Sequence, residues 1–242
     1  MSKLEKEIQS FQKVWKGGYK TGYSAKRNQI GLENYLAENL SGDNFLEIGC
    51  GGGQWSKYIL NLNLFKKMTC VDVLTEEHNN FWSFVGEEAR EIITYQKIDN
   101  CELQFLEDKS IDYVFSYDVF CHLSLSTIND YLESLYKKCK DGAVLLIMYA
   151  DPAKYIFSEP ENRKHLMKYL PSKKLIYNIS NRVLIRDALK DMDGKPSDPD
   201  FEPRWFWIGK NKFIDLCEKQ GFKIINEDLN IDKTNPITLF QK

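Results

Sequence analysis

The sequence predicts an α/β fold in which a mostly parallel sheet carries helices on both faces. Over residues 30–150, short apolar runs typical of buried strands alternate with longer amphipathic segments. This alternation favours parallel strands joined by crossover helices. The last two strands are separated only by residues 228–236, which is too short for a crossover helix, so this pair should be antiparallel. We therefore expect seven strands ending in an antiparallel hairpin.

We place each strand and helix by the periodicity of its apolar residues and by the residue types that commonly end such elements. Gly142 is expected to end the fourth predicted helix and Gly221 the fifth. The strands are predicted at 45–48, 68–73, 93–98, 110–116, 143–149, 222–227 and 237–241, and the helices at 30–40, 55–61, 76–90, 127–140 and 211–220.

Three parts of the chain differ in composition. Residues 30–150 and 205–242 carry the regular pattern and form the main domain, whereas residues 151–204, an insert after the fifth strand, are rich in proline and lack clean periodicity. Residues 1–29 are polar with inserted aromatic residues. They form either an arm that packs on the domain or a lid over a bound cofactor and substrate.

A glycine-rich loop follows the first strand. Glu47 lies near the end of the apolar run, and Gly49, Gly51 and Gly53 follow at every second position. Glycine at these positions permits positive φ and close approach of a ligand to the backbone. The dinucleotide fingerprint requires a further glycine where Gln54 stands, so an NAD site is disfavoured. A carboxylate beside the loop suits a cationic ligand rather than a pyrophosphate.

Acidic residues also end the next two strands. Asp72 lies at the end of the second strand, where nucleotide-binding sheets hold a ribose diol. Asp99 and Asn100 follow the third strand and are suited to an adenine amino group. Each acid alone could be a solvated loop residue, but acids at three successive strand ends indicate one site. S-adenosylmethionine, which carries an ammonium and a sulfonium but no phosphate, fits these features.

These motifs resemble the class I S-adenosylmethionine-dependent methyltransferases. Residues 47–53 match the first motif of that family, and residues 110–118 match its fourth motif. The resemblance implies a Rossmann-like fold. More narrowly, Gly53-Gln54-Trp55 and residues 115–123 resemble a bacterial subgroup often found among sugar- or polysaccharide-modifying enzymes. The expected cofactor-binding residues are Glu47, Gly49, Gly51, Gly53, Trp55, Asp72, Val73, Asp99, Asn100, Tyr117 and Asp118.

The expected catalytic residues follow the fourth strand. Asp118 is placed near the transferred methyl group, and His122 comes four residues later, on the same face if the segment turns helically. His122 is the first candidate for a general base, with Asp118 orienting it or acting as the base itself. Alternatively, His122 caps the segment or fills space. The cysteines lack zinc-site spacing, so a metal-free reaction is expected.

The acceptor is expected to be a small polar molecule with a hydroxyl group. The tail of the fourth strand lacks the Pro-Pro-aromatic motif of enzymes that methylate bases. Aromatic and arginine side chains in the insert suit a sugar or a sugar phosphate, although the aromatic residues could equally form a small core. The resemblance to the bacterial subgroup implies an acceptor that belongs to a surface polysaccharide, such as capsule, while the pathway stays open. The predicted substrate-binding residues are Tyr19, Tyr23, Arg163, Arg182, Arg204 and Trp205.

Bulk properties restrict the partners. The net charge is −2 without a basic block, so nucleic acid is not an expected partner. No apolar run is long enough to cross a bilayer, so no membrane span is expected. A cytoplasmic location is expected because residues 1–10 are charged, unlike a signal peptide, and because the six cysteines are interpreted as reduced thiols. The oligomeric state stays open, with a homodimer as one option. The alternatives are a methyltransferase acting on a protein or RNA, and a non-catalytic protein that binds S-adenosylmethionine.

Overall fold

The computed structural model describes residues 25–159, 189, 194 and 206–242, with the backbone alone for residues 25–29. The predicted arm and most of the predicted insert lie outside these residues. The predicted boundaries of the arm, the domain and the insert therefore stay predictions. The same holds for all six predicted substrate-binding residues: Tyr19, Tyr23, Arg163, Arg182, Arg204 and Trp205.

The described chain is organised around a seven-stranded sheet with the order β3-β2-β1-β4-β5-β7-β6. The first five strands pair in parallel, and β7 pairs antiparallel with both β5 and β6. The Rossmann-like sheet with an antiparallel C-terminal hairpin is thus confirmed. The strands are β1 Asn44–Ile48, β2 Lys67–Asp72, β3 Ile93–Lys97, β4 Ile111–Ser116, β5 Cys139–Met148, β6 Lys223–Asn226 and β7 Ile237–Gln241.

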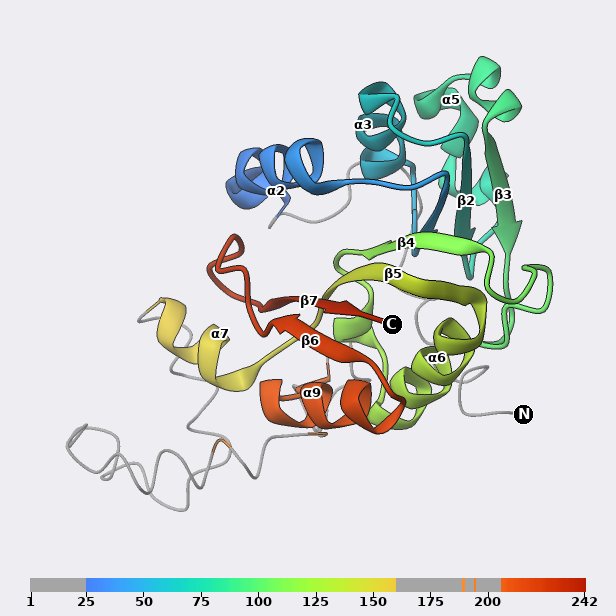
Figure 1. Ribbon diagram of the computed structural model, residues 1–242. Coiled ribbons are helices and arrows are strands. Elements are labelled where there is room, and N and C mark those ends of the chain that lie inside the picture. Colours follow the sequence, from blue (N-terminus) through green and yellow to red (C-terminus); the bar gives the residue numbers. More distant parts are fainter. Residues whose placement is uncertain (1–24, 160–188, 190–193, 195–205) are drawn as a thin grey trace.

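Helices cover both faces of the sheet, with α2, α3 and α5 on one side and α6 and α9 on the other (Figure 1). Side chains on β1 alternate between the two apolar layers: Phe45 faces the first, and Leu46 and Ile48 face the second. The helices are α2 Ala25–Asn39, α3 Gln54–Leu62, α4 Glu76–Asn79, α5 Phe81–Val85, η1 Glu87–Glu91, η2 Phe120–His122, α6 Leu125–Lys138, α7 Pro152–Ser158 and α9 Lys210–Lys219, with η marking 3-10 turns.

The single helix predicted at 76–90 is wrong. This stretch forms three short helical turns instead. Asn80 adopts a left-handed conformation with φ 50°, and its N–H bonds to the carbonyl groups of Glu76 and Glu77, which ends the first turn. Gly86, with φ 116°, separates the second turn from the third. The middle turn, α5, buries Phe81, Trp82 and Val85.

The predicted role of Gly142 as the stop of the fourth helix is also wrong. The helix α6 ends at Lys138, and Cys139 already pairs with Ile111 in the sheet. Gly142 lies inside β5 with φ 88°, and its N–H bonds to the carbonyl of Lys242 at 2.8 Å. Pairing with neighbouring strands extends β5 backwards, an effect that local periodicity does not report.

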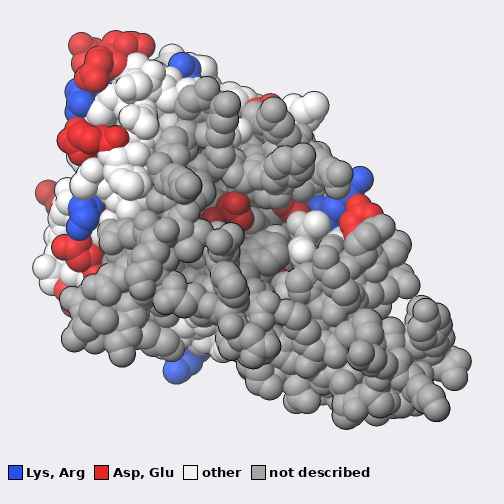
Figure 2. Space-filling view, turned by 180° about the vertical axis from the view of Figure 1, so that it is seen from behind, with Lys and Arg blue, Asp and Glu red and all other residues white. Residues whose placement is uncertain are grey.

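The described surface carries charges of both signs. Acidic and basic side chains alternate along one edge of the face in Figure 2, and the described part of that face has no continuous basic area. Among the described residues, no helix combines the length and apolar character that crossing a bilayer requires.

Candidate functional site

The candidate site lies where the order of the sheet reverses. β1 and β4 are parallel neighbours, with Glu47 opposite Phe115, and β2 and β5 flank them on opposite sides. Open α/β sheets bind ligands at such a switch point, outside the carboxyl ends of the strands. The glycine loop, residues 49–53, follows β1 at this edge, and residues 117–122 follow β4.

The glycine loop has the backbone that the sequence predicted. Gly49, Gly51 and Gly53 have φ values of 75°, 51° and 84°. A Cβ atom on Gly49 would lie 2.1 Å from Cγ2 of Val119, so the loop packs directly on the segment after β4. Gly53 is the N-cap of α3 and supplies no side-chain cap. The first N–H groups of α3 therefore suit a carboxylate, such as that of a bound amino acid.

Asp72 links the second strand to the glycine loop. Its Oδ2 accepts a hydrogen bond from the N–H of Gly51 at 2.9 Å, and its Oδ1 accepts one from the N–H of Leu74 at 2.9 Å. Burial raises the pKa of Asp72, and these backbone hydrogen bonds oppose that rise. The carboxylate lies beside the loop at the end of β2, in the place expected for a ribose ligand, and that role stays a prediction.

Glu47 lies beneath the loop rather than on its surface, with 2% of the residue exposed. Its Oε2 accepts hydrogen bonds from Oγ of Ser56 at 2.5 Å and from Sγ of Cys70 at 3.6 Å. Burial raises the pKa of Glu47 to about 7, and the nearby charge of Asp72 contributes to the rise. A bound cation close to Glu47 would favour the ionised carboxylate. Sequence reasoning missed Ser56 and Cys70, because neither residue type has a distinctive pattern.

Asp99 and Asn100 lie exposed beyond the end of β3. The Asp99 carboxylate forms an ion pair with Lys97 at 2.6 Å, and 74% of its side chain is exposed. Val73 is half-buried next to Asp72. The predicted contacts of these three residues with a nucleoside stay predictions.

Tyr117 connects two distant parts of the chain at the end of β4. Its hydroxyl donates a hydrogen bond to Oδ2 of Asp232 at 2.7 Å. Its ring lies 5.5 Å from the ring of Trp55, the second residue of α3. Tyr117, Trp55 and Asp232 are all buried. Sequence reasoning missed Asp232, although the turn-forming residues at 232–236 signal a tight connection there.

Asp118, Cys121 and His122 form one cluster after β4. One ligand atom from each residue lies within 4.8 Å of the other two. Asp118 has φ 61°, an uncommon conformation for a residue other than glycine, and Sγ of Cys121 lies 3.5 Å from Oδ1 of Asp118. Asp118 and His122 therefore do lie together, although a 3-10 turn rather than an α-helix brings them there. Atoms of these types could also hold a metal ion, so metal-free chemistry stays a prediction.

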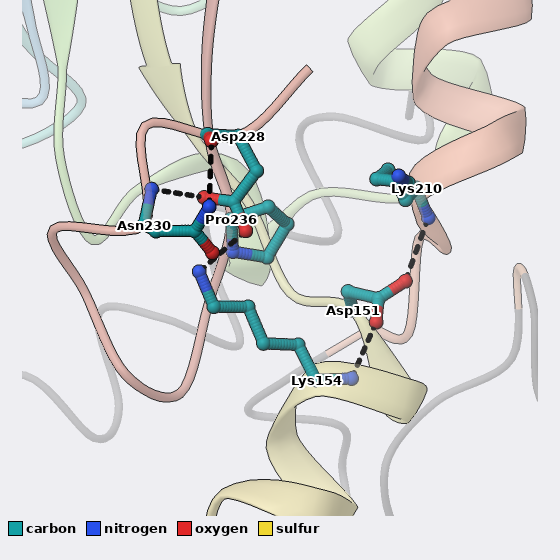
Figure 3. A pocket seen from close by; sticks show the side chains of 6 residues that line it. All are labelled: Asp151, Lys154, Lys210, Asp228, Asn230 and Pro236. Atoms are coloured by element: carbon teal, nitrogen blue, oxygen red, sulfur yellow. Dashed lines mark hydrogen bonds and ion pairs between the residues drawn. The ribbon is translucent and has the colours of Figure 1, made fainter. Parts of the chain in front are cut away.

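A polar pocket of about 260 Å³ lies at the same edge, beyond β5 and β7. Asp151 accepts hydrogen bonds from the N–H groups of Lys154 at 2.6 Å and Lys210 at 2.8 Å, which ties α7 to α9 (Figure 3). The ammonium of Lys154 pairs with Asp228 at 2.5 Å. The charged side chains of this pocket are therefore paired with groups inside it: Lys154 with Asp228, and Asp151 with two backbone N–H groups. These contacts anchor the start of the predicted insert. Asn230 and Pro236 complete the lining with these residues and Lys210.

Comparisons with known proteins agree with this geometry. Residues 46–147 match the family described as a methyltransferase domain. None of the curated proteins matches the chain in sequence. A solved S-adenosylmethionine-dependent methyltransferase from Mesorhizobium loti superposes with a TM-score of 0.62 at 10% identity, over 89% of this chain and 98% of that one.

Two other solved structures share the fold. An S-adenosylmethionine-dependent methyltransferase from Methanosarcina mazei has a TM-score of 0.54 at 15% identity, over 87% of this chain and 96% of that one. The phosphoethanolamine N-methyltransferase 2 of Haemonchus contortus, solved with phosphomonomethylethanolamine and S-adenosylhomocysteine, has a TM-score of 0.55 at 14% identity. That alignment covers 98% of this chain and 57% of that one.

The fold, the glycine loop and the matched domain define a methyltransferase enzyme. S-adenosylmethionine is the methyl donor of solved methyltransferases that share this fold. The residues at the switch point fit this group: a loop with glycine at four of its five positions meets the carboxylate of Asp72, and the carboxyl of Glu47 lies just beneath the loop. The matched range contains the glycine loop, Asp72 and the cluster of Asp118, Cys121 and His122, so the candidate site lies inside the domain that carries the activity.

Proposed function

We propose that the enzyme transfers a methyl group from S-adenosylmethionine to a hydroxyl of a small polar acceptor, a sugar or a sugar nucleotide or phosphate of bacterial surface polysaccharide. The observation that carries the chemical part of the proposal is the proximity of Asp118 and His122 at the end of β4. The sugar class rests on the aromatic and arginine residues of the predicted insert and on the resemblance of residues 115–123 to the bacterial subgroup.

Methyl transfer is a displacement at carbon that requires an aligned nucleophile. When bound, S-adenosylmethionine supplies the electrophilic methyl group. The protein aligns the acceptor, which contributes about 7–11 kcal/mol in favourable cases, and removes the proton of the acceptor hydroxyl. In this proposal His122 accepts that proton and Asp118 orients the imidazole. A general base contributes about 10²–10⁴-fold, so alignment lowers the barrier more than the base does, and the loss of the base leaves residual activity.

The experiment is transfer of a labelled methyl group from S-adenosylmethionine to a panel of acceptors. The panel contains monosaccharides, sugar phosphates, nucleotide sugars, a protein extract and transfer RNA. We expect label in a carbohydrate product in which a methyl ether is detected by mass spectrometry. Label found only in protein or RNA contradicts the proposed acceptor class, and label in an amine contradicts transfer to a hydroxyl.

The proposed base is tested with the same assay. We expect His122→Asn to lower kcat by about 10²-fold or more without loss of cofactor binding in calorimetry. His78→Gln is the matched control, because His78 is an exposed histidine outside the cluster. Equal kcat values for the two variants would exclude His122 as the base.

A further inference from the structure

The connection between β6 and β7, residues 227–236, reaches the end of β4. Asp232 in this connection is fully buried. Its Oδ1 accepts hydrogen bonds from the N–H of Thr234 at 2.7 Å, the hydroxyl of Thr234 at 2.8 Å and the N–H of Asn235 at 3.0 Å. Its Oδ2 accepts the hydrogen bond of the Tyr117 hydroxyl at 2.7 Å. The turn around Asp232 thus fixes one carboxylate oxygen and presents the other to Tyr117.

The ring of Tyr117 is held from two sides. Trp55 contacts it with an interplanar angle of 59°, and Trp55 belongs to the helix that begins at the glycine loop. Asp232 holds the hydroxyl from the opposite end of the sequence. Because the hydroxyl proton is donated to Asp232, the phenol oxygen can only accept a further hydrogen bond. Tyr117 also directly precedes Asp118, the first member of the proposed catalytic cluster.

The same connection offers a second polar group. Oδ1 of Asn235 is buried and has no hydrogen-bond partner among the described residues. A buried acceptor without a partner is costly unless a ligand or water satisfies it. A hydroxyl-rich molecule at this edge can supply such a donor. The connection therefore fixes the phenol of Tyr117 through Asp232 and also carries an acceptor without a partner, Oδ1 of Asn235.

We propose that Asp232 is a positioning residue for methyl transfer, which acts by fixing the Tyr117 phenol between the glycine-loop helix and the connection at 227–236. The orientation of Tyr117, and with it the alignment of the acceptor beside Asp118, depends on this hydrogen bond. The proposal rests on the proposed function for the identity of the acceptor and for the place of methyl transfer beside Asp118. Asp232 does not touch the reacting atoms and acts through Tyr117.

The first test needs no acceptor. The protein is labelled with 3-fluorotyrosine, and the ¹⁹F resonance of Tyr117 is assigned by its loss in Tyr117→Phe. We expect the Tyr117 resonance to be single and narrow in the parent protein, and to be shifted and broadened in Asp232→Asn. Asparagine keeps one side-chain oxygen that can accept the hydrogen bonds of Thr234 and Asn235. Asp228→Asn is the matched control, because it lies in the same connection but pairs with Lys154, and it should leave the resonance unchanged. An unchanged resonance in Asp232→Asn overturns the proposal.

The second test is kinetic and uses whichever acceptor the panel identifies. Asp232→Asn and Tyr117→Phe should each lower kcat by about 10-fold to 100-fold, as expected for a small misalignment. In Asp232→Asn the calorimetric Kd for S-adenosylmethionine should stay within about threefold of the parent value, because Asp232 is not one of the expected cofactor-binding residues. The double variant should be no slower than Tyr117→Phe alone, because Asp232 acts through that residue. Losses that multiply, or an unchanged kcat in Tyr117→Phe, overturn the proposal.

Two precautions keep the outcomes distinct. If Asp232→Asn fails to fold, as judged by circular dichroism, Tyr117→Phe removes the same hydrogen bond and leaves the other three bonds of Asp232 in place. Transfer to a protein or RNA instead of a sugar refutes the proposed acceptor class. The fluorine spectra still decide the role of Asp232 in that case.

Discussion

Glu47 illustrates at the scale of one residue how burial changes chemistry. The sequence identifies it as an acid beside a glycine loop, and the structure places its carboxyl under the loop against Ser56 and Cys70. A carboxyl with a pKa of about 7 exchanges its proton near neutrality. Binding of a cationic cofactor can therefore be linked to release of that proton.

The raised pKa of Glu47 predicts a pH-dependent stability. The ordinary value is 4.5 and the folded value is about 7. Between them the folded chain holds a proton that the unfolded chain has released, so the free energy of unfolding falls as pH rises, by on the order of 3 kcal/mol. Glu47→Gln should flatten this part of the profile in urea unfolding. Glu133→Gln, at an exposed position on α6, should keep the slope. A parent protein without the slope contradicts the prediction.

Gly49 predicts a steric requirement at the cofactor loop. In Gly49→Ala the new Cβ would clash with Val119, because the two atoms would lie 2.1 Å apart. We expect calorimetric affinity for S-adenosylhomocysteine to fall by at least about tenfold, since the loop must move away from residues 117–122. Gly142→Ala is the control, with a positive φ of 88° but its nearest neighbour 4.0 Å away. It should show only backbone strain of about 1–2 kcal/mol. Equal binding by both variants contradicts the steric explanation.

At the scale of elements, the helices α7 and α9 share one capping residue, Asp151. Asp151 caps α7 and also accepts a hydrogen bond from the first residue of α9. One carboxylate therefore joins the chain on both sides of the predicted insert. The helix α7 begins at Pro152, the second residue of the predicted insert, and α9 begins at Lys210, after the insert ends.

Asp151→Ala should destabilise both helices at once. Losing one cap costs about 1 kcal/mol, so we expect the free energy of unfolding to fall by about 2 kcal/mol. Asp215→Ala, at an exposed position on α9, should change it by less than about 0.5 kcal/mol. Urea unfolding followed by circular dichroism measures both. Similar values for the two variants would show that Asp151 does not join the helices.

At the scale of the whole molecule, the sheet separates two apolar layers that together enclose every cysteine. All six thiols are free and buried, with at most 6% of any cysteine exposed. Burial also raises the pKa of the thiols of Cys50, Cys70, Cys139 and Cys217. Because thiolates are the reactive form, these cysteines should be inert while the fold is intact.

Thiol reactivity should therefore report global unfolding. With an aromatic disulfide reagent we expect no rapid reaction in buffer and reaction of all six cysteines in guanidinium chloride. S-adenosylhomocysteine should slow the residual reaction, because it stabilises the folded state by mass action. The absorbance of the released thiolate measures both quantities. A cysteine that reacts at once in buffer would contradict the closed layers.

The sequence by itself determined the local features: the strands at the switch point, the glycine loop, the acids at the ends of β1 and β2, and the antiparallel end of the sheet. These follow from patterns within a few residues, such as alternation of apolar residues and the spacing of glycines. The proximity of Asp118 and His122 also follows from short-range spacing.

Only the tertiary structure decided the rest. The contacts of Glu47 with Ser56 and Cys70, and of Tyr117 with Asp232, join residues 9, 23 and 115 positions apart. The turns that divide residues 76–91 and the early start of β5 likewise depend on packing and strand pairing. The order and register of the strands bring such residues together. The periodicity of apolar residues predicts which face of the sheet a side chain occupies, but not which distant residue it contacts there.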